Sequence, residues 1–170
     1  MKKAIIISGT PGTGKTVITN LLKKEGYTTI EVGKLVKEEI LYDYYDEERE
    51  SYVVNDDLLN EKLIELLQNH SSSRPLIIDG HVVELPPKYV LHCIVLRCSI
   101  QHLRQRLMER NYGSSKIDEN VEAEIMEVLL TDMLELYGPE NVSIVFSDGS
   151  VEETFEQVLA KVKKVLNNTS

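Results

Sequence analysis

Five short apolar segments recur along the chain, and each is separated from the next by at least one segment with helical spacing. The first, Ala4-Ile5-Ile6-Ile7, has the uninterrupted β-branched pattern of a strand buried on both faces. The others cover 27–32, 76–78, 90–96 and 142–146. Strands that alternate with helices predict an α/β fold, with a five-stranded parallel sheet and helices on both faces.

Apolar residues at helical spacing predict the intervening helices. In the first helix the apolar positions lead up to Gly26, which suits a helix C-terminus. Because parallel crossovers are right-handed, the loops after the strands gather along one edge, where such sheets bind ligands. The predicted helices cover 15–25 (apolar Val17, Ile18, Leu21 and Leu22), 56–69 (Leu58, Leu59, Leu63, Leu66 and Leu67 on one face), 99–110, 118–137 and 151–167.

The loop between the first strand and the first helix matches G-x-x-x-x-G-K-[ST], a P-loop. Its glycines let backbone amides surround a phosphate, at which the following helix aims its positive end. Lys15 is expected to bridge the terminal phosphates, and the Thr16 hydroxyl to bind Mg²⁺. The loop therefore predicts ATP binding with Mg²⁺ as cofactor. Its ATP-binding residues are Gly9, Pro11, Gly12, Thr13, Gly14, Lys15 and Thr16.

An acidic residue, Asp79, ends the apolar run 76–78. This arrangement lets a carboxylate reach the water shell of Mg²⁺ beside a P-loop, although an Asp before Gly is also a common turn residue. His81 follows two residues later. It is a candidate to position a water or accept its proton, and the alternative is a purely structural histidine.

Two arginines, Arg106 and Arg110, lie four residues apart on one predicted helix face. Both can point into one site, where guanidinium groups stack on a base or bind phosphates. The alternative is a solvated basic helix face. The helix runs into a short polar loop at 111–116 that contains Gly113, and this loop is predicted to be a mobile flap.

The length of 170 residues fits one globular domain. A net charge of −9 argues against direct binding of nucleic acid and favours a basic protein partner. Cys93 and Cys98 are expected to be buried reduced thiols. The sequence shows neither a signal peptide nor a membrane span, so we expect a cytoplasmic protein, or a nuclear one in a eukaryote.

The stretch 42–50 combines tyrosines with acidic residues. One interpretation is plain solvated surface. The other is a docking site for a basic partner, because acidic and aromatic side chains together suit a surface rich in arginine.

With these motifs in order, the chain resembles the adenylate kinase superfamily over essentially its full length. The stretches 32–39, 41–43, 46–48 and 110–112, with Lys116 and 119–120, look like the adenylate kinase isoenzyme 6 group of archaea and eukaryotes. This resemblance implies a P-loop NTPase of the nucleoside-monophosphate kinase type with a short lid. It also implies transfer of the γ-phosphoryl of ATP to AMP or another monophosphate, ATPase activity, and a role in small ribosomal subunit rRNA maturation with a ribosomal protein.

The same resemblance assigns roles to residues. Lys15, Asp79, His81 and Arg110 would be catalytic, Asp79 would hold Mg²⁺ through water, and Arg106 and Arg110 would bind ATP. The acceptor monophosphate would contact Val32, Gly33, Lys37 and Gly80. The implied division is a core of 1–32, 70–107 and 118–170, a monophosphate-binding insert of about 33–69 and a lid of about 108–117.

Two departures from the family pattern concern the acceptor site. Lys37 stands where relatives often carry an arginine, which can bind a phosphate with two parallel hydrogen bonds. His81, Val82 and Val83 replace the aromatic, proline and phosphate-binding arginine of larger adenylate kinases. An ATPase assembly factor acting on a ribosomal protein, with the kinase reaction secondary, therefore remains an alternative. A sugar or shikimate-type kinase is disfavoured by 32–46, and the lid carries no Cys or His cluster for zinc.

Overall fold

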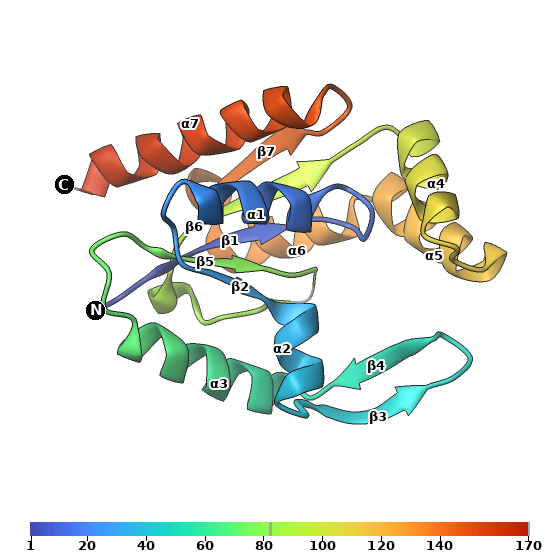
Figure 1. Ribbon diagram of the computed structural model, residues 1–170, viewed down its shortest axis with the longest axis horizontal. Coiled ribbons are helices and arrows are strands. Elements are labelled where there is room, and N and C mark those ends of the chain that lie inside the picture. Colours follow the sequence, from blue (N-terminus) through green and yellow to red (C-terminus); the bar gives the residue numbers. More distant parts are fainter. Residues whose placement is uncertain (82, 170) are drawn as a thin grey trace.

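A five-stranded parallel sheet in the order β2-β5-β1-β6-β7 forms the centre of the computed structural model, which describes residues 1–81 and 83–169 (Figure 1). Each neighbouring pair of strands is parallel. This sheet confirms the predicted fold class. Its strands are β1 (Ala4–Ser8), β2 (Thr29–Glu31), β5 (Leu76–Asp79), β6 (Val90–Arg97) and β7 (Val142–Phe146).

Helices cover both faces of the sheet because successive side chains of each central strand point to opposite sides. Ile5 and Ile7 of β1 pack in one cluster with residues of α1 and α7. Ala4 and Ile6 pack in the other, with residues of α2, α3 and α6. The helices are α1 (Lys15–Lys24), α2 (Val32–Glu38), α3 (Asp56–Asn69), α4 (Ile100–Glu109), α5 (Ser114–Ile125), α6 (Val128–Tyr137) and α7 (Val151–Thr169), with 3-10 turns at Pro87–Tyr89 and Pro139–Asn141.

Two details of the predicted burial and one predicted strand boundary are wrong. The runs 27–32 and 142–146 form the two edge strands, so Phe146 is 57% exposed instead of buried on both faces. Val32 belongs to α2 rather than to a strand. Leu58 is 43% exposed, because α3 buries only the row Leu59, Leu63 and Leu67.

The helix predicted at 118–137 is two helices, and the polar loop before it is shorter than expected. α5 already begins at Ser114, and the chain turns at Glu127, whose φ of 55° is left-handed. The chain turns here because the two helices pack against different neighbours. Val121 of α5 packs against α4, whereas Met133 of α6 packs against the sheet, and a single straight helix could not make both contacts.

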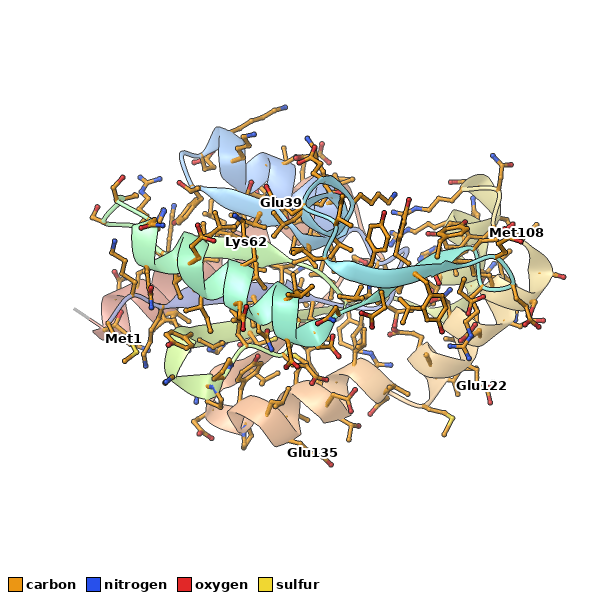
Figure 2. The ribbon with its side chains drawn as sticks, turned by 90° about the horizontal axis from the view of Figure 1, so that it is seen from below. Met1, Glu39, Lys62, Met108, Glu122 and Glu135 are labelled. Carbon is orange, nitrogen blue, oxygen red and sulfur yellow. The ribbon has the colours of Figure 1, made fainter. Side chains whose placement is uncertain are left out.

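A two-stranded antiparallel hairpin of β3 (Tyr42–Asp46) and β4 (Ser51–Val54) follows α2. Its tyrosines hold it together, since the rings of Tyr42 and Tyr45 lie 4.4 and 5.0 Å from the ring of Tyr52. A weak ion pair of 3.7 Å between Lys62 of α3 and Glu39 at the end of α2 braces this part of the chain (Figure 2). The sequence did not predict the hairpin because its acidic composition masks the strand pattern.

Both ends of the chain lie at the opposite end of the sheet from the hairpin and the α4–α5 pair (Figure 1). The two cysteines are buried and free, as predicted, and burial raises the pKa of Cys93 to about 12. Across 1–81 and 83–169, no helix is both long and apolar enough to cross a bilayer. Val82, one of the three residues noted after Asp79-Gly80, lies outside the described residues.

Candidate active site

The P-loop, Gly9 to Thr16, begins directly after β1 and ends in the first turn of α1, as its motif predicts. Gly9 has φ +148°, and a Cβ there would lie 2.6 Å from the carbonyl oxygen of Leu96. Gly12 has φ +96°, and its Cβ would lie 3.0 Å from Leu103 and from Leu107 of α4. At both positions the backbone conformation and the crowding require glycine. The loop is thus packed closely between β6 and α4.

Lys15 is buried against the backbone of this loop. Its Nζ donates hydrogen bonds to the carbonyl oxygens of Gly9 and, at 3.2 Å, of Thr10. Burial lowers the pKa of Lys15 to about 8, Asp79 and Glu124 act against that shift, and Arg110 adds to it. The side chain is therefore still mostly protonated at neutral pH, as binding to phosphate oxygens requires.

Asp79 ends β5 beside Ile7 of β1 and Glu31 of β2. It is 3% exposed, and its Oδ2 has no hydrogen-bond partner within the described part of the chain. Burial raises its pKa, Glu31 acts in the same direction, and Lys15 and the Thr16 hydroxyl oppose the shift. A buried carboxylate oxygen without a partner, next to a hydroxyl, fits a hard cation such as Mg²⁺ or its water shell.

His81 lies in the loop after β5 and keeps part of its surface exposed. Even so, loss of water around the imidazole lowers its pKa to about 4, and the charges of Lys15 and Lys116 act in the same direction. The imidazole is therefore neutral at physiological pH. A neutral histidine can accept a proton or a hydrogen bond from water.

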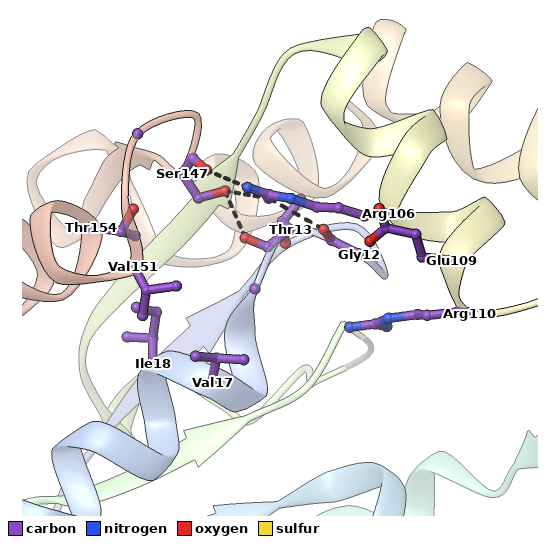
Figure 3. Close-up of a pocket in the computed structure, with 12 residues that line it drawn as sticks. Gly12, Thr13, Val17, Ile18, Arg106, Glu109, Arg110, Ser147, Val151 and Thr154 are labelled. Carbon is purple, nitrogen blue, oxygen red and sulfur yellow. Dashed lines mark hydrogen bonds between the residues drawn. The ribbon is translucent and has the colours of Figure 1, made fainter.

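Next to the P-loop lies a pocket of about 260 Å³, into which Arg106 and Arg110 both project from the C-terminal end of α4 (Figure 3). Arg106 donates to the carbonyl oxygen of Ser147 at 2.6 Å and to its hydroxyl at 3.1 Å. Ser147 in turn donates to the carbonyl oxygen of Thr13 at 2.6 Å. These bonds fix the Arg106 guanidinium beside the loop, whereas Arg110 is exposed at the pocket mouth.

Most of the residues that line this pocket carry no motif in the sequence and were not predicted. Ser147 and Gly149 follow β7, so their place after a strand at the binding edge was the signal that could have identified them. Val17 and Ile18 were interpreted only as apolar helix positions, yet both line the pocket. The further lining residues that were not predicted are Glu109, Val151 and Thr154.

The four predicted acceptor residues lie at the ends of β2 and β5 and along α2. A Cβ on Gly80 would lie 3.0 Å from the Val32 side chain, so these two residues pack directly together. Val32 is buried, whereas Gly33 has open space beside it. Lys37 lies one turn further along α2, with its Nζ 5.7 Å from the centre of the Tyr52 ring of the hairpin.

Lys116 connects the two sides of this region. Its Nζ donates a 3.1 Å hydrogen bond to the carbonyl oxygen of Glu50 in the hairpin turn and lies 4.3 Å from the centre of the Tyr112 ring. Because its charge also acts on His81, this lysine lies near the loop after β5. The sequence marks Lys116 only through the family resemblance and predicts no role for it in the site.

Comparison with known proteins gives a consistent result. Residues 5–127 match the family model described as AAA domain. The chain is 35% identical to adenylate kinase isoenzyme 6 homolog FAP7 of Saccharomyces cerevisiae, over 95% of this chain and 79% of that protein. It is 33% identical to the adenylate kinase isoenzyme 6 homolog of Caenorhabditis elegans, over 91% of this chain and 86% of that protein.

Among solved structures, a gluconokinase from Sinorhizobium meliloti 1021 aligns with a TM-score of 0.57 and 18% identity. The alignment covers 98% of this chain and 95% of the gluconokinase. At this identity the likeness concerns the fold alone, and it agrees with a P-loop kinase architecture.

Proposed function

The chain belongs to the adenylate kinase isoenzyme 6 family, and from this membership we propose that it transfers the γ-phosphoryl group of Mg-ATP to AMP. The names of its relatives support a nucleotide kinase role. We propose further that other nucleoside monophosphates are accepted and that the protein has intrinsic ATPase activity. The observation that carries this proposal is the buried Asp79 oxygen beside the P-loop lysine, an oxygen that has no hydrogen-bond partner among residues 1–81 and 83–169.

In this reaction a phosphate oxygen of AMP attacks the γ-phosphorus, the bond to the β,γ-bridging oxygen breaks, and two ADP leave. The P-loop amides and Lys15 would hold the phosphates, and Arg106 and Arg110 would contact the base, ribose or γ-phosphate from the pocket beside them. Mg²⁺, bound by Thr16 and through water by Asp79, would supply charge neutralisation at the phosphates.

AMP would lie along Gly33, Gly80 and Lys37. The segments 33–69 and 108–117 would cover the bound nucleotides and exclude water.

Water is the competing acceptor, and His81 favours that alternative. Its low pKa keeps the imidazole neutral, so it can orient a water toward the γ-phosphate by accepting a hydrogen bond from it, although the same low pKa makes it a weak base. Lys37 offers a single ammonium to the acceptor phosphate, and no arginine follows Gly80 in 81–83. An ATPase assembly factor with a secondary kinase reaction is thus our second candidate.

Incubating the protein with Mg-ATP, with and without AMP, and resolving ADP from free phosphate tests both candidates. A kinase gives ADP from ATP plus AMP with little phosphate, whereas an ATPase releases phosphate without AMP. We expect His81→Ala to lower phosphate release by about 10-fold, because the attacking water loses the hydrogen bond that orients it. We expect ADP formation from AMP to change less. An unchanged rate of ATP turnover in both assays would remove His81 from the mechanism.

A basic small-subunit ribosomal protein is the partner we propose, with a role in small-subunit rRNA maturation in the cytoplasm or nucleus. The hairpin supports a docking role, since Tyr44 and Tyr45 are 58% and 47% exposed beside acidic side chains. Asp43 and Asp46 accept hydrogen bonds within the hairpin region, whereas Glu47 and Glu48 are exposed at its turn. These two glutamates are the best charges to remove without disturbing the hairpin.

We expect the double variant Glu47→Gln with Glu48→Gln to retain less ribosomal protein in a pull-down of purified small-subunit proteins. The loss should diminish as salt is raised, because surface charge attraction is screened. The matched control removes two exposed charges elsewhere, Glu122→Gln with Glu135→Gln on α5 and α6 (Figure 2). Equal retention of ribosomal protein by both double variants would contradict the docking role and leave the hairpin as ordinary solvated surface.

A further inference from the structure

A buried carboxylate, Glu124 near the end of α5, contacts the P-loop from the side of the lid. It is 4% exposed, and an ionised carboxylate is that deeply buried only where several donors compensate the lost water. Its Oε1 accepts a 2.8 Å hydrogen bond from Nε of Arg97, and its Oε2 accepts a 2.6 Å bond from the Thr10 hydroxyl. Each carboxylate oxygen thus has its own donor.

Arg97 fixes the position of Glu124 through more than one bond. It ends β6, and its Nη2 donates to the backbone carbonyl of Glu124 at 2.8 Å. Its Nη1 donates to Glu127, the left-handed residue between α5 and α6, at 2.6 Å. The guanidinium therefore holds both the carboxylate and the corner of the chain that carries it.

Thr10 is the point at which this network meets the phosphate loop. Its carbonyl oxygen accepts hydrogen bonds from the amide and the hydroxyl of Thr13, at 3.2 and 2.8 Å, and from Nζ of Lys15 at 3.2 Å. Its side chain is held by Glu124 instead. The same residue thus offers its side chain to Glu124 and its carbonyl oxygen to Lys15.

We propose that Glu124 is a positioning residue for phosphoryl transfer, which it assists by holding Thr10 and thereby the backbone that orients Lys15. Because α5 begins within the proposed lid, the contact also links the lid to the phosphate loop. The inference rests on the proposed function for its effect on rate. It predicts in addition that the network strengthens Mg-ATP binding, which can be measured without turnover.

The test compares Thr10→Val, Thr10→Ser and Glu124→Gln with the parent protein by steady-state turnover, calorimetric Mg-ATP affinity and thermal melting. Thr10→Val has nearly the same shape and leaves the Arg97–Glu124 pair intact, so it is expected to fold even if Glu124→Gln does not. We expect it to lower kcat about 10-fold, the size of one hydrogen bond to a charged group. KM should change less, and Thr10→Ser should restore most of the rate.

In the double variant Thr10→Val with Glu124→Gln, the combined loss should be smaller than the product of the single losses, because both changes weaken the same Thr10–Glu124 contact. The control is Asp118→Asn, which removes an exposed carboxylate from the same helix, bonded to Arg104 at 2.9 Å. Parent-like kcat and affinity in Thr10→Val, or multiplying losses, would overturn the inference. A parent protein that binds Mg-ATP without turnover would instead overturn the proposed function, and the affinities would still decide the role of Glu124.

Discussion

Lys15→Met is expected to lower ATP turnover by at least about 100-fold and to weaken Mg-ATP binding severely. The methionine keeps the length and apolar stem of the side chain but removes the ammonium that would contact the terminal phosphates. The matched control is Lys23→Met, an exposed lysine on the same helix. Calorimetry and the ADP assay measure the two losses, and parent-like affinity in Lys15→Met would refute the P-loop assignment.

The thermal stability of Lys15→Met should show whether the loss of turnover and of Mg-ATP binding comes from the missing ammonium or from misfolding. Burial lowers the pKa of Lys15 from 10.5 to about 8, so the unfolded chain binds more protons between those values. Stability contributed by this residue therefore rises with pH through that window, and the charged lysine opposes folding at neutral pH. We expect the melting temperature of Lys15→Met at neutral pH to equal or exceed that of the parent.

Asp79→Asn is the second substitution with a large expected effect. We expect turnover to fall about 100-fold, and the Mg²⁺ concentration that gives half-maximal rate to rise, because an amide neither carries the charge nor orients the water shell as a carboxylate does. The measurement is a Mg²⁺ titration of the rate at saturating ATP.

The fold should again tolerate the change, because burial raises the pKa of Asp79 and makes its ionised form costly. Asp57→Asn, at an exposed position of α3, is the control for a carboxylate replaced elsewhere. A Mg²⁺ dependence shared by Asp79→Asn and the parent would exclude Asp79 from the metal site.

The sheet was predictable because its three inner strands are buried on both faces and their sequences show this directly. β1 is the clearest case, with Ala4 to Ile7 all fully buried. The P-loop and Asp79 were predictable for a related reason: a fixed motif and the end of a buried strand place them at the binding edge. The roles assigned to them remain predictions that the substitutions above test.

Contacts between distant segments were not predictable. Glu124 looks like an ordinary surface glutamate of an acidic helix, and only the fold brings it to Thr10, 114 positions away. No glycine or proline near Glu127 indicates the bend in the sequence. The bend arises because α5 and α6 pack against different neighbours. The place of Ser147 in the pocket was not predictable, because a single serine after an edge strand belongs to no recognisable motif.

The position of the chain ends has a practical consequence for single-molecule and surface experiments. Met1 and the end of α7 both lie away from the loops that line the pocket beside the P-loop (Figure 1). A biotin or an affinity tag attached at either end would point the pocket and the hairpin toward the bulk solution. Immobilised protein is therefore expected to bind nucleotide and partner as freely as protein in solution.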